Sequence, residues 1–294
     1  MHAPVLVAEV ISQLAPARGG LFVDCTLGAG GHTRALLAAG ASRVLAFDRD
    51  RTALALAGTQ LADVSARVEM VHADYRSLAD ELDARGLTHV DGGILADLGV
   101  SSMQLDDEAR GFSFRADAPL DMRMDRDSGR TAAEMLRDVD EAALADVIYQ
   151  YGEERFSRRV ARAIVRAREA GPLETTGQLA AIVRRAVPTR GWQRIDPATR
   201  TFQAIRIWVN RELEGLDAFL RIAVSRLLVG ARIAVIAFHS LEDRIVKHTF
   251  RALAQGPEST LSLITRRPIE ATEDEIARNP RARSAKLRVA ERLA

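Results

Sequence analysis

Short apolar runs alternate with segments of helical periodicity over the first hundred residues. The apolar runs cover residues 20–24, 43–48, 67–73 and 92–97, and each ends at or just before an aspartate. Between them, residues 32–39, 50–61 and 78–85 space their apolar positions as an amphipathic helix does. Short strands alternating with helices indicate βαβ units and a parallel sheet with right-handed crossovers. The pattern therefore predicts an α/β fold with a doubly wound, Rossmann-like sheet.

This alternation stops after Gly99 and resumes late in the chain. Residues 105–130 are polar and rich in Asp and Arg, and helical patterns follow at 149–169 and 176–187. The return to the sheet is predicted as a helix at 201–228, a strand at 231–238, a helix at 241–254 and closing strands at 261–268 and 286–292. We therefore predict one α/β domain, residues 1–104 and 200–294, interrupted by an inserted helical domain, residues 105–199.

Charge is distributed unevenly along a chain whose formal net charge is only +1. Residues 153–211 contain 13 arginines and five acids, a net charge of +8, and residues 278–292 carry +5. On the helix predicted at 149–169, four arginines share one face: Arg155, Arg159, Arg162 and Arg166. This segregation favours a polyanionic partner. Charge alone is equally compatible with arginine-rich helices that simply face solvent.

Composition excludes several classes of protein. A 294-residue chain with 47% hydrophobic and 28% charged residues is typical of a soluble globular protein. The single cysteine, Cys25, permits no internal disulfide, and the six histidines cluster neither with it nor with one another, so no metal site is predicted. Residues 1–14 lack the basic start of a secretory signal, and the best apolar run, 231–238, is far too short to span a membrane. We therefore expect a cytoplasmic protein.

The sharpest local signal is a glycine-rich turn between the first predicted strand and the first predicted helix. Asp24 ends the strand, and Gly30, Gly31 and His32 lead into the helix. Glycines let the backbone approach a ligand closely, and a helix N-terminus favours polar or anionic groups. Asp48 ends the next strand, 18 residues after Gly30. A carboxylate at that place can accept hydrogen bonds from the hydroxyls of a ribose.

Two cofactor classes use such a turn. A dinucleotide site requires a third small residue, and counted from Gly28 that position is Thr33, so the dinucleotide fingerprint fails. An S-adenosylmethionine site needs a glycine turn with an acid ahead of it, which Asp24 supplies. At the third strand, Asp74 can bond an adenine amine and Tyr75 can stack on the ring. Ligands of open α/β sheets bind at the carboxyl ends of the strands. Four successive strand ends carry acids: Asp24, Asp48, Asp74 and Asp97.

Long and unusual motifs are distributed from end to end of the chain. They are DLGVSSMQLD (97–106), RGFSF (110–114), PLDMRM (119–124), YGEERF (151–156), RTFQA (200–204), RIWVN (206–210), HSLEDR (239–244) and NPRARS (279–284). Together these motifs resemble the bacterial small-subunit ribosomal RNA methyltransferase H family, also called MraW. Their length and number make the resemblance specific.

The resemblance implies a class I methyltransferase sheet with an inserted substrate-recognition domain. It implies S-adenosylmethionine as cofactor and methylation of the exocyclic N4 of a cytidine in the decoding region of small-subunit (16S) rRNA, with naked rRNA or an assembled small ribosomal subunit as the substrate. The oligomeric state stays open, a homodimer included. The implied cofactor contacts are Gly30, Gly31, His32, Asp48, Tyr75, Asp97 and Gln104.

Candidate residues for the chemistry follow from the substrate. A cytosine amine is a poor nucleophile because its lone pair is delocalised, so a group that accepts its N–H would help the reaction. Asp97 is the candidate for that group, and cofactor or substrate binding are its alternative roles. Substrate-binding candidates are Ser101, Ser102, Arg110, Phe112, Phe114, Arg123, Arg155, Arg159, Arg162 and His239. The serines and the histidine are equally compatible with local capping, and the two phenylalanines with anchoring a loop to the core.

Two other classes of protein are alternatives to a methyltransferase. An NAD-dependent oxidoreductase is disfavoured by Thr33, which breaks the dinucleotide fingerprint. A non-catalytic RNA-binding protein on a methyltransferase fold is the second alternative, because a fold does not prove an activity. The complete set of acids and glycines argues against a degenerate pocket.

Overall fold

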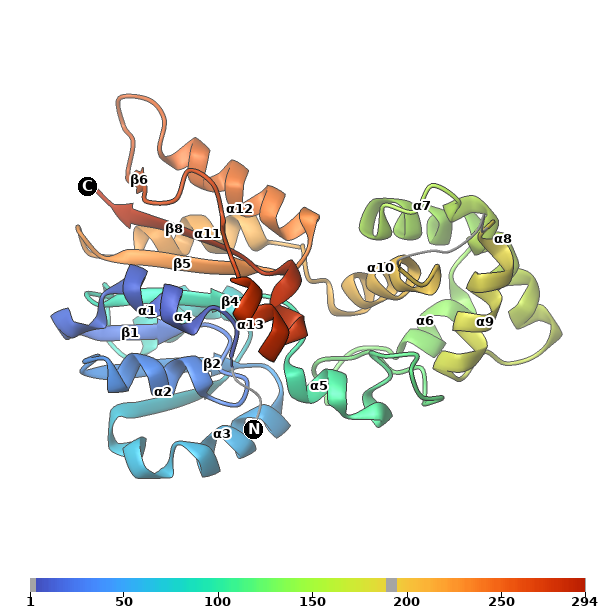
Figure 1. Ribbon diagram of the computed structural model, residues 1–294, viewed down its shortest axis with the longest axis horizontal. Coiled ribbons are helices and arrows are strands. Elements are labelled where there is room, and N and C mark those ends of the chain that lie inside the picture. Colours follow the sequence, from blue (N-terminus) through green and yellow to red (C-terminus); the bar gives the residue numbers. More distant parts are fainter. Residues whose placement is uncertain (1–3, 189–194, 294) are drawn as a thin grey trace. The chain divides into compact units, whose positions relative to one another are not determined.

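The computed structural model describes residues 4–188 and 195–293, with the side chain of Ser102 left aside. The chain divides into two units, Met1–Gly99 with Leu213–Ala294, and Val100–Glu212 (Figure 1). Each unit has its own hydrophobic core. Within the described ranges, no helix has both the length and the apolar character needed to cross a bilayer.

The first unit is built on one sheet, as the alternating pattern predicts. Its strands are β1 (Leu21–Asp24), β2 (Arg43–Asp48), β3 (Val68–His72), β4 (Gly93–Asp97), β5 (Arg232–Ala237), β6 (Leu261–Leu263), β7 (Ile269–Glu270) and β8 (Lys286–Arg292). The strand order is β3-β2-β1-β4-β5-β8-β6, with β7 paired to β8. Strands β1 to β5 are parallel and β8 runs antiparallel to β5. The predicted α/β fold class is confirmed, and the chain order reverses direction between β1 and β4.

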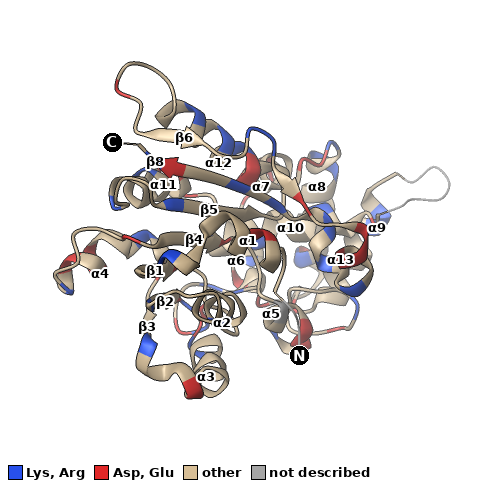
Figure 2. Cartoon of the chain, turned by 60° about the vertical axis from the view of Figure 1, so that its left-hand side comes forward, with Lys and Arg blue, Asp and Glu red and all other residues tan. Residues whose placement is uncertain are grey.

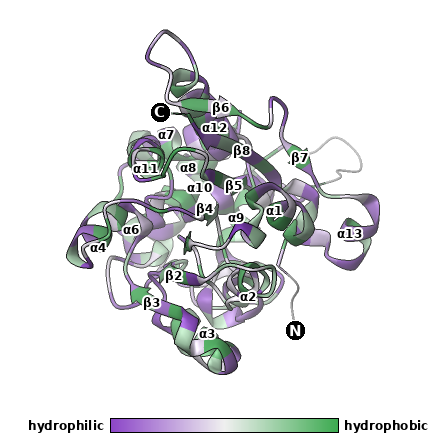
Figure 3. Ribbon diagram, turned by 90° about the vertical axis from the view of Figure 1, so that its left-hand side faces the viewer, coloured by the Kyte–Doolittle hydropathy of each residue, from purple (hydrophilic) through white to green (hydrophobic). Residues whose placement is uncertain are grey.

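Helices cover both faces of this sheet. They are α1 (Val7–Leu14), α2 (Gly31–Ala38), α3 (Arg51–Gln60), α4 (Leu78–Ala84), α11 (Leu216–Ser225), α12 (Ser240–Leu253) and α13 (Glu273–Arg278). Alternate residues of each central strand enter opposite cores: Val23 packs with residues of α4, α11 and α12, whereas Phe22 packs with residues of α1, α2 and α3. Each helix mixes hydrophobic and hydrophilic residues, as expected when one side faces a sheet (Figure 3).

The second unit is helical. It contains α5 (Ser102–Asp106), α6 (Ala132–Asp138), α7 (Glu141–Gly152), α8 (Ser157–Ala170), α9 (Thr176–Ala186) and α10 (Ala198–Asn210). The polar segment before α6 has no long helix of its own, but Phe112, Leu120, Met122 and Met124 tie it to the helical core. The Asn210 side chain fixes it further, accepting from the Met124 N–H at 2.7 Å and donating to the Met122 carbonyl at 2.7 Å.

The helix predicted at 149–169 is wrong as a single element. Helix α7 ends at Gly152, and Glu153 adopts a left-handed φ of 50° before α8 begins at Ser157. Gly152 is the last residue of α7, and its lack of a side chain lets α10 pack closely, since a Cβ there would lie 2.6 Å from the Arg200 carbonyl oxygen. The buried Glu154 carboxylate then accepts the Phe156 N–H at 2.8 Å and starts the next helix. Arg155 therefore precedes α8 and is not part of a continuous arginine face.

The helix predicted at 201–228 is also two helices, α10 and α11. Arg211 has a left-handed φ of 51°, and Gly215 starts α11 with a φ of 68°. Phe202 and Ile205 of α10 are buried in the helical core, so α10 belongs to the second unit and does not return to the sheet. The second unit therefore spans Val100–Glu212, wider than the 105–199 expected from sequence.

Two further differences lie in the first unit. The strand predicted at 261–268 is only three residues long, because the Ile264 and Thr265 N–H groups both turn to the Val289 carbonyl at 3.1 Å. Helices α1 and α13 were not predicted, since each is short and neither is bounded by strong strand signals.

Candidate active site

The glycine-rich turn sits on a buried carboxylate. Asp24 is fully buried and accepts the Thr33 hydroxyl at 2.7 Å and the Thr26 N–H at 3.1 Å. Burial raises the pKa of Asp24, and His32 and these two donors offset that only in part. Asp24 therefore supports the turn from beneath. The sequence prediction placed it among the cofactor contacts but missed Thr33 as its partner.

The turn itself requires glycine at two positions. Gly28 and Gly30 have φ of 52° and 83°, which side chains rarely allow. A Cβ on Gly30 would also lie 2.8 Å from the Leu61 side chain. Gly31 is the first residue of α2 and His32 the second, so the N–H groups at this helix start carry no intrahelical partner. Such N–H groups are suited to bind polar or anionic groups of a ligand.

Asp48 links this turn to the second strand. One carboxylate oxygen accepts the Gly28 N–H at 2.8 Å, and the other accepts the Asp50 N–H at 2.8 Å. Burial raises the pKa of Asp48 to about 6, although both hydrogen bonds lower it. Each oxygen keeps a further lone pair, so the carboxylate can still accept a ribose hydroxyl.

His32 and Asp97 form a buried polar pair next to the same turn. The His32 Nε2 lies 3.6 Å from an Asp97 carboxylate oxygen. Burial lowers the pKa of His32, but Asp97 and Asp24 outweigh burial and raise it overall. Within the described residues, both ring nitrogens of His32 and the Asp97 Oδ1 are buried without a hydrogen-bond partner. Such atoms are rare in native proteins and indicate a place where a ligand's polar groups bind.

The Asp97 backbone is fixed by a residue that the sequence prediction missed. The Asp97 N–H donates to the Thr26 hydroxyl at 2.6 Å, which joins the ends of β1 and β4. These two strands flank the point where the sheet order reverses. Ligands of doubly wound sheets bind at that point, beyond the carboxyl ends of the strands. The structure therefore brings Asp24, His32, Asp48 and Asp97 to the edge where the sequence placed them.

Tyr75 and Asp74 follow the third strand. The Tyr75 ring packs against Phe219 with centroids 4.5 Å apart, and burial raises the pKa of its phenol to about 12. Asp74 accepts the Arg76 N–H at 3.0 Å and lies within 3.6 Å of the guanidinium groups of Arg49 and Arg76. Asp74 thus has local capping and ion-pair partners, besides the adenine contact predicted for it.

Several predicted residues belong to the second unit, where they organise the polar segment. Ser101 and Gln104 cap α5 reciprocally, each side chain bonding the backbone N–H of the other. Arg110 is buried and donates to the Arg123 and Met124 carbonyls, at 3.1 and 2.7 Å. The Arg123 guanidinium binds Asp121 at 2.7 Å. The predicted role of the Ser102 side chain lies outside the described residues.

The two phenylalanines of this segment pack inward. Phe112 is 8% exposed, and the Phe114 ring meets the Phe202 ring edge-on at 4.7 Å, with the Arg184 guanidinium 5.4 Å from its centre. Both contacts correspond to the anchoring alternative, so stacking on a base is not needed to explain either residue.

Helix α8 exposes a row of cations. Its buried face carries Val160, Ala161 and Ile164, whereas Arg159, Arg162 and Arg166 are exposed, and so is Arg158, which the prediction omitted. Arg162 pairs with Glu141 at 3.3 Å in solvent. The guanidinium carbon of Arg155 instead lies over the Phe156 ring, 4.6 Å from the ring centroid.

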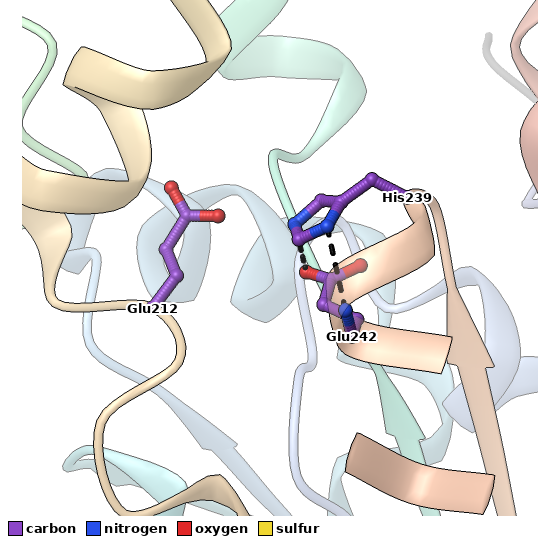
Figure 4. Close-up of side chains that lie close together, drawn as sticks. All are labelled: Glu212, His239 and Glu242. Carbon is purple, nitrogen blue, oxygen red and sulfur yellow. Dashed lines mark hydrogen bonds and ion pairs between the residues drawn. The ribbon is translucent and has the colours of Figure 1, made fainter. Parts of the chain in front are cut away.

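His239 caps α12 in the first unit. Its Nδ1 accepts the Glu242 N–H at 3.4 Å, and its Nε2 lies 3.2 Å from the Glu242 carboxylate (Figure 4). Glu242 is buried and also accepts the Phe238 N–H at 2.8 Å. The sequence prediction named His239 but not Glu242; an acid three residues after the cap was the available signal. Glu212, also drawn in Figure 4, belongs to the second unit and binds Arg206 through both oxygens, at 2.9 and 2.8 Å.

Comparisons of the sequence with known proteins identify a family. A family model described as the MraW methylase family matches residues 1–293. The ribosomal RNA small subunit methyltransferase H of Geotalea uraniireducens is 49% identical over 308 residues, covering 99% of this chain and 98% of its own length. The protein of the same name from Deinococcus radiodurans is 54% identical, covering 100% and 90%. A solved rRNA methylase structure from Streptococcus thermophilus has a TM-score of 0.45 and 12% identity, with both chains fully covered.

The doubly wound sheet and its glycine turn, taken with the family match, define an S-adenosylmethionine-dependent methyltransferase. Within that class, the chain belongs to the MraW methylase family.

Proposed function

We propose that this chain methylates the exocyclic N4 of a cytidine in the decoding region of small-subunit (16S) rRNA. The observation that carries the proposal is Asp97, a carboxylate with one buried and unpartnered oxygen at the end of β4. The names of the relatives support the RNA substrate, and the base and atom are what the resemblance to the family implies. The reaction would take place in the cytoplasm, where ribosomal particles are assembled.

The first unit offers a set of groups that fits S-adenosylmethionine. The N–H groups at Gly31 and His32 suit the methionine part, and Asp48 suits the ribose hydroxyls. The Gly30 N–H donates to the Leu27 carbonyl at 2.8 Å, so the proposed contribution of Gly30 is a turn that lets the ligand approach closely. Tyr75, with Asp74, suits the adenine ring and amine. Gln104 of the second unit is a further proposed contact. When bound, the cofactor would supply a methyl group on a positively charged sulfur. A nitrogen nucleophile would attack the methyl carbon in line, and the sulfur would leave.

The role proposed for Asp97 is to accept an N–H of the cytosine amine. That hydrogen bond would return electron density to the nitrogen, and the carboxylate could then accept the proton that the amine loses. His32, 3.6 Å away, would hold the Asp97 carboxylate in position and stabilise its negative charge. Asp97 is therefore the proposed catalytic residue and His32 the proposed positioning residue.

The second unit is proposed to recognise the substrate. Its exposed arginines, Arg158, Arg159, Arg162 and Arg166, suit the phosphates of an RNA backbone, which position a substrate without reading its sequence. Either naked rRNA or an assembled small subunit fits this surface, and a homodimer is compatible with it.

The test is mass spectrometry of rRNA nucleosides after incubation with labelled S-adenosylmethionine and small ribosomal subunits. We expect labelled N4-methylcytidine with the wild-type chain. Asp97→Asn should reduce turnover by about 10²–10⁴-fold while changing cofactor affinity little, because the contact forms in the chemical step. The exposed Asp146→Asn is the matched control. A different methylated nucleoside would contradict the assignment, and equal losses of turnover and affinity would limit Asp97 to cofactor binding.

A further inference from the structure

A shallow basic hollow lies on the surface of the first unit, between α12 and the segment that links β6 to β7. Four cations line it, Lys247, Arg251, Arg266 and Arg288, and we call these residues the basic hollow. Figure 2 colours the lysine and arginine positions along α12 blue. None of the predicted site residues contributes to it, although Arg288 comes from the basic C-terminal segment 278–292.

Two segments of the fold hold most of these cations in place, α12 and the segment that links β6 to β7. Val246 and Phe250 bury the inner side of α12 in the sheet core, so Lys247 and Arg251, four residues apart, lie together on its outer side. Thr265 is tied to β8, since its hydroxyl accepts the Val289 N–H at 2.9 Å. That bond holds the adjoining Arg266 beside α12. The arrangement is thus built by segments that are separate in sequence.

The charge of the basic hollow is not balanced. Arg288 is buried and binds both oxygens of Asp243, at 2.6 and 3.1 Å, so that carboxylate is already engaged. Among the residues that the structure describes, Lys247, Arg251 and Arg266 form no ion pair. Between residues 244 and 268 there are five basic residues and one acid, Glu258. Like charges held together repel, and an anionic ligand relieves that repulsion.

We propose that the basic hollow binds a phosphate of the RNA backbone, an inference that rests on the proposed function. Arginine presents a planar fork that matches phosphate oxygens. The aromatic side chain in the wall, Phe250, is only 3% exposed and offers no face on which a base can stack. The contact is therefore with the backbone and independent of sequence. It adds an RNA contact on the first unit to the one proposed for α8.

The test is the salt dependence of binding by the complete chain. Arg251→Ala/Arg266→Ala is compared with wild type for affinity to small ribosomal subunits between 50 and 200 mM salt. Each lost phosphate contact lowers the slope of log affinity against log salt by about 0.7–0.9. Over this fourfold range of salt, the loss of one phosphate contact means that the wild-type affinity should fall about 2.6- to 3.5-fold more than that of the double variant. Both arginines are exposed, so S-adenosylmethionine affinity should stay unchanged and report that the variant is folded.

Two controls make the result specific. Arg43→Ala/Arg67→Ala removes two exposed charges from the first unit at the opposite half of the sheet and should keep the wild-type slope. Arg251→Lys/Arg266→Lys should keep most of the binding, because the charge remains. A wild-type slope in the double alanine variant, or the same reduction in the Arg43/Arg67 control, would overturn the proposal.

A parallel titration with naked rRNA separates the remaining sources. If the double alanine variant loses affinity for the particle but not for naked rRNA, the hollow binds an acidic ribosomal protein and the RNA proposal is wrong. Failure of the proposed function is distinguishable. In that case, wild type would bind RNA with the expected slope and produce no N4-methylcytidine.

Discussion

Asp48 provides the most direct test of the cofactor site, because its carboxylate both shapes the glycine turn and faces the proposed ribose. Burial raises its pKa from the ordinary 3.8 to about 6. At 1.36 kcal/mol per pKa unit, ionised Asp48 costs the folded protein about 3 kcal/mol. A carboxyl with a raised pKa binds its proton more tightly when folded. The protein without ligand is therefore stabilised at low pH, and this stabilisation is lost as pH rises from about 4 through 6.

Asp48→Asn removes that titration. The amide oxygen of the asparagine can still accept one of the two backbone N–H groups. The amide nitrogen is a donor, so the other N–H, of Gly28 or Asp50, loses its acceptor. The variant should be less stable at low pH. Between pH 5 and 8, however, wild type should lose about 1.5 kcal/mol of unfolding free energy relative to the variant. Urea denaturation at several pH values measures the difference. A constant difference across this range would show that Asp48 does not titrate as described.

The same substitution tests the ribose contact. Hydroxyls that donate to the carboxylate favour its ionised form, so S-adenosylmethionine should bind more tightly above pH 6 and should release a proton when it binds below that pH. In Asp48→Asn both effects should disappear, and affinity should fall by about 1–3 kcal/mol, which is about 5- to 150-fold. Calorimetry in two buffers of different ionisation enthalpy measures affinity and proton release together. A folded variant with wild-type affinity and unchanged proton release would refute the ribose assignment.

Two other substitutions probe the turn and the substrate surface. Thr33→Val removes the hydroxyl that binds buried Asp24 at 2.7 Å, and it should lower the unfolding free energy by about 1–3 kcal/mol; an unchanged urea midpoint would mean that this bond contributes nothing net. Arg159→Ala/Arg162→Ala should flatten the salt dependence of RNA binding by a slope of about 1 per lost contact and leave S-adenosylmethionine affinity unchanged, whereas an identical slope would make these arginines a solvated surface only.

Residues at the strand ends were predictable because the signals there are local. A β-branched or apolar run closed by an acid identifies β1, β2 and β4, and parallel pairing then brings Asp24, Asp48 and Asp97 to one edge. What the pattern did not give was the direction of each side chain. Asp24 ends a strand like the others, but it is wholly buried beneath the turn, because Thr33 of α2 reaches back to it.

The errors lie where packing between distant segments overrides periodicity. Apolar spacing continues across Gly152, yet α7 ends at this residue, where α10 packs so closely that a Cβ would lie 2.6 Å from the Arg200 carbonyl oxygen. Such a contact is invisible in the local sequence. Phe112 and Phe114 show the same limit of prediction from sequence. An aromatic residue in a polar loop gives the same sequence pattern whether its ring stacks on a base or packs into a core. Arg110, which the sequence predicted as a substrate contact, is buried and donates to two backbone carbonyls, a placement that the local sequence does not indicate.

The insertion between β4 and β5 sets the order in which this protein can fold as it is synthesised. The two strands are paired along their length, yet 134 residues separate Asp97 from Arg232. At a translation rate of about 5–20 residues per second, β4 waits roughly 7 to 27 s for its neighbour. During that time its outer edge is an unpaired, strongly apolar strand in the middle of an unfinished sheet. The helical unit has its own core and can fold meanwhile, whereas the sheet is completed only when the C-terminal β8 leaves the ribosome. Destabilising changes in β5 or β8 should therefore reduce the yield of folded protein in cells more than their effect on equilibrium stability suggests.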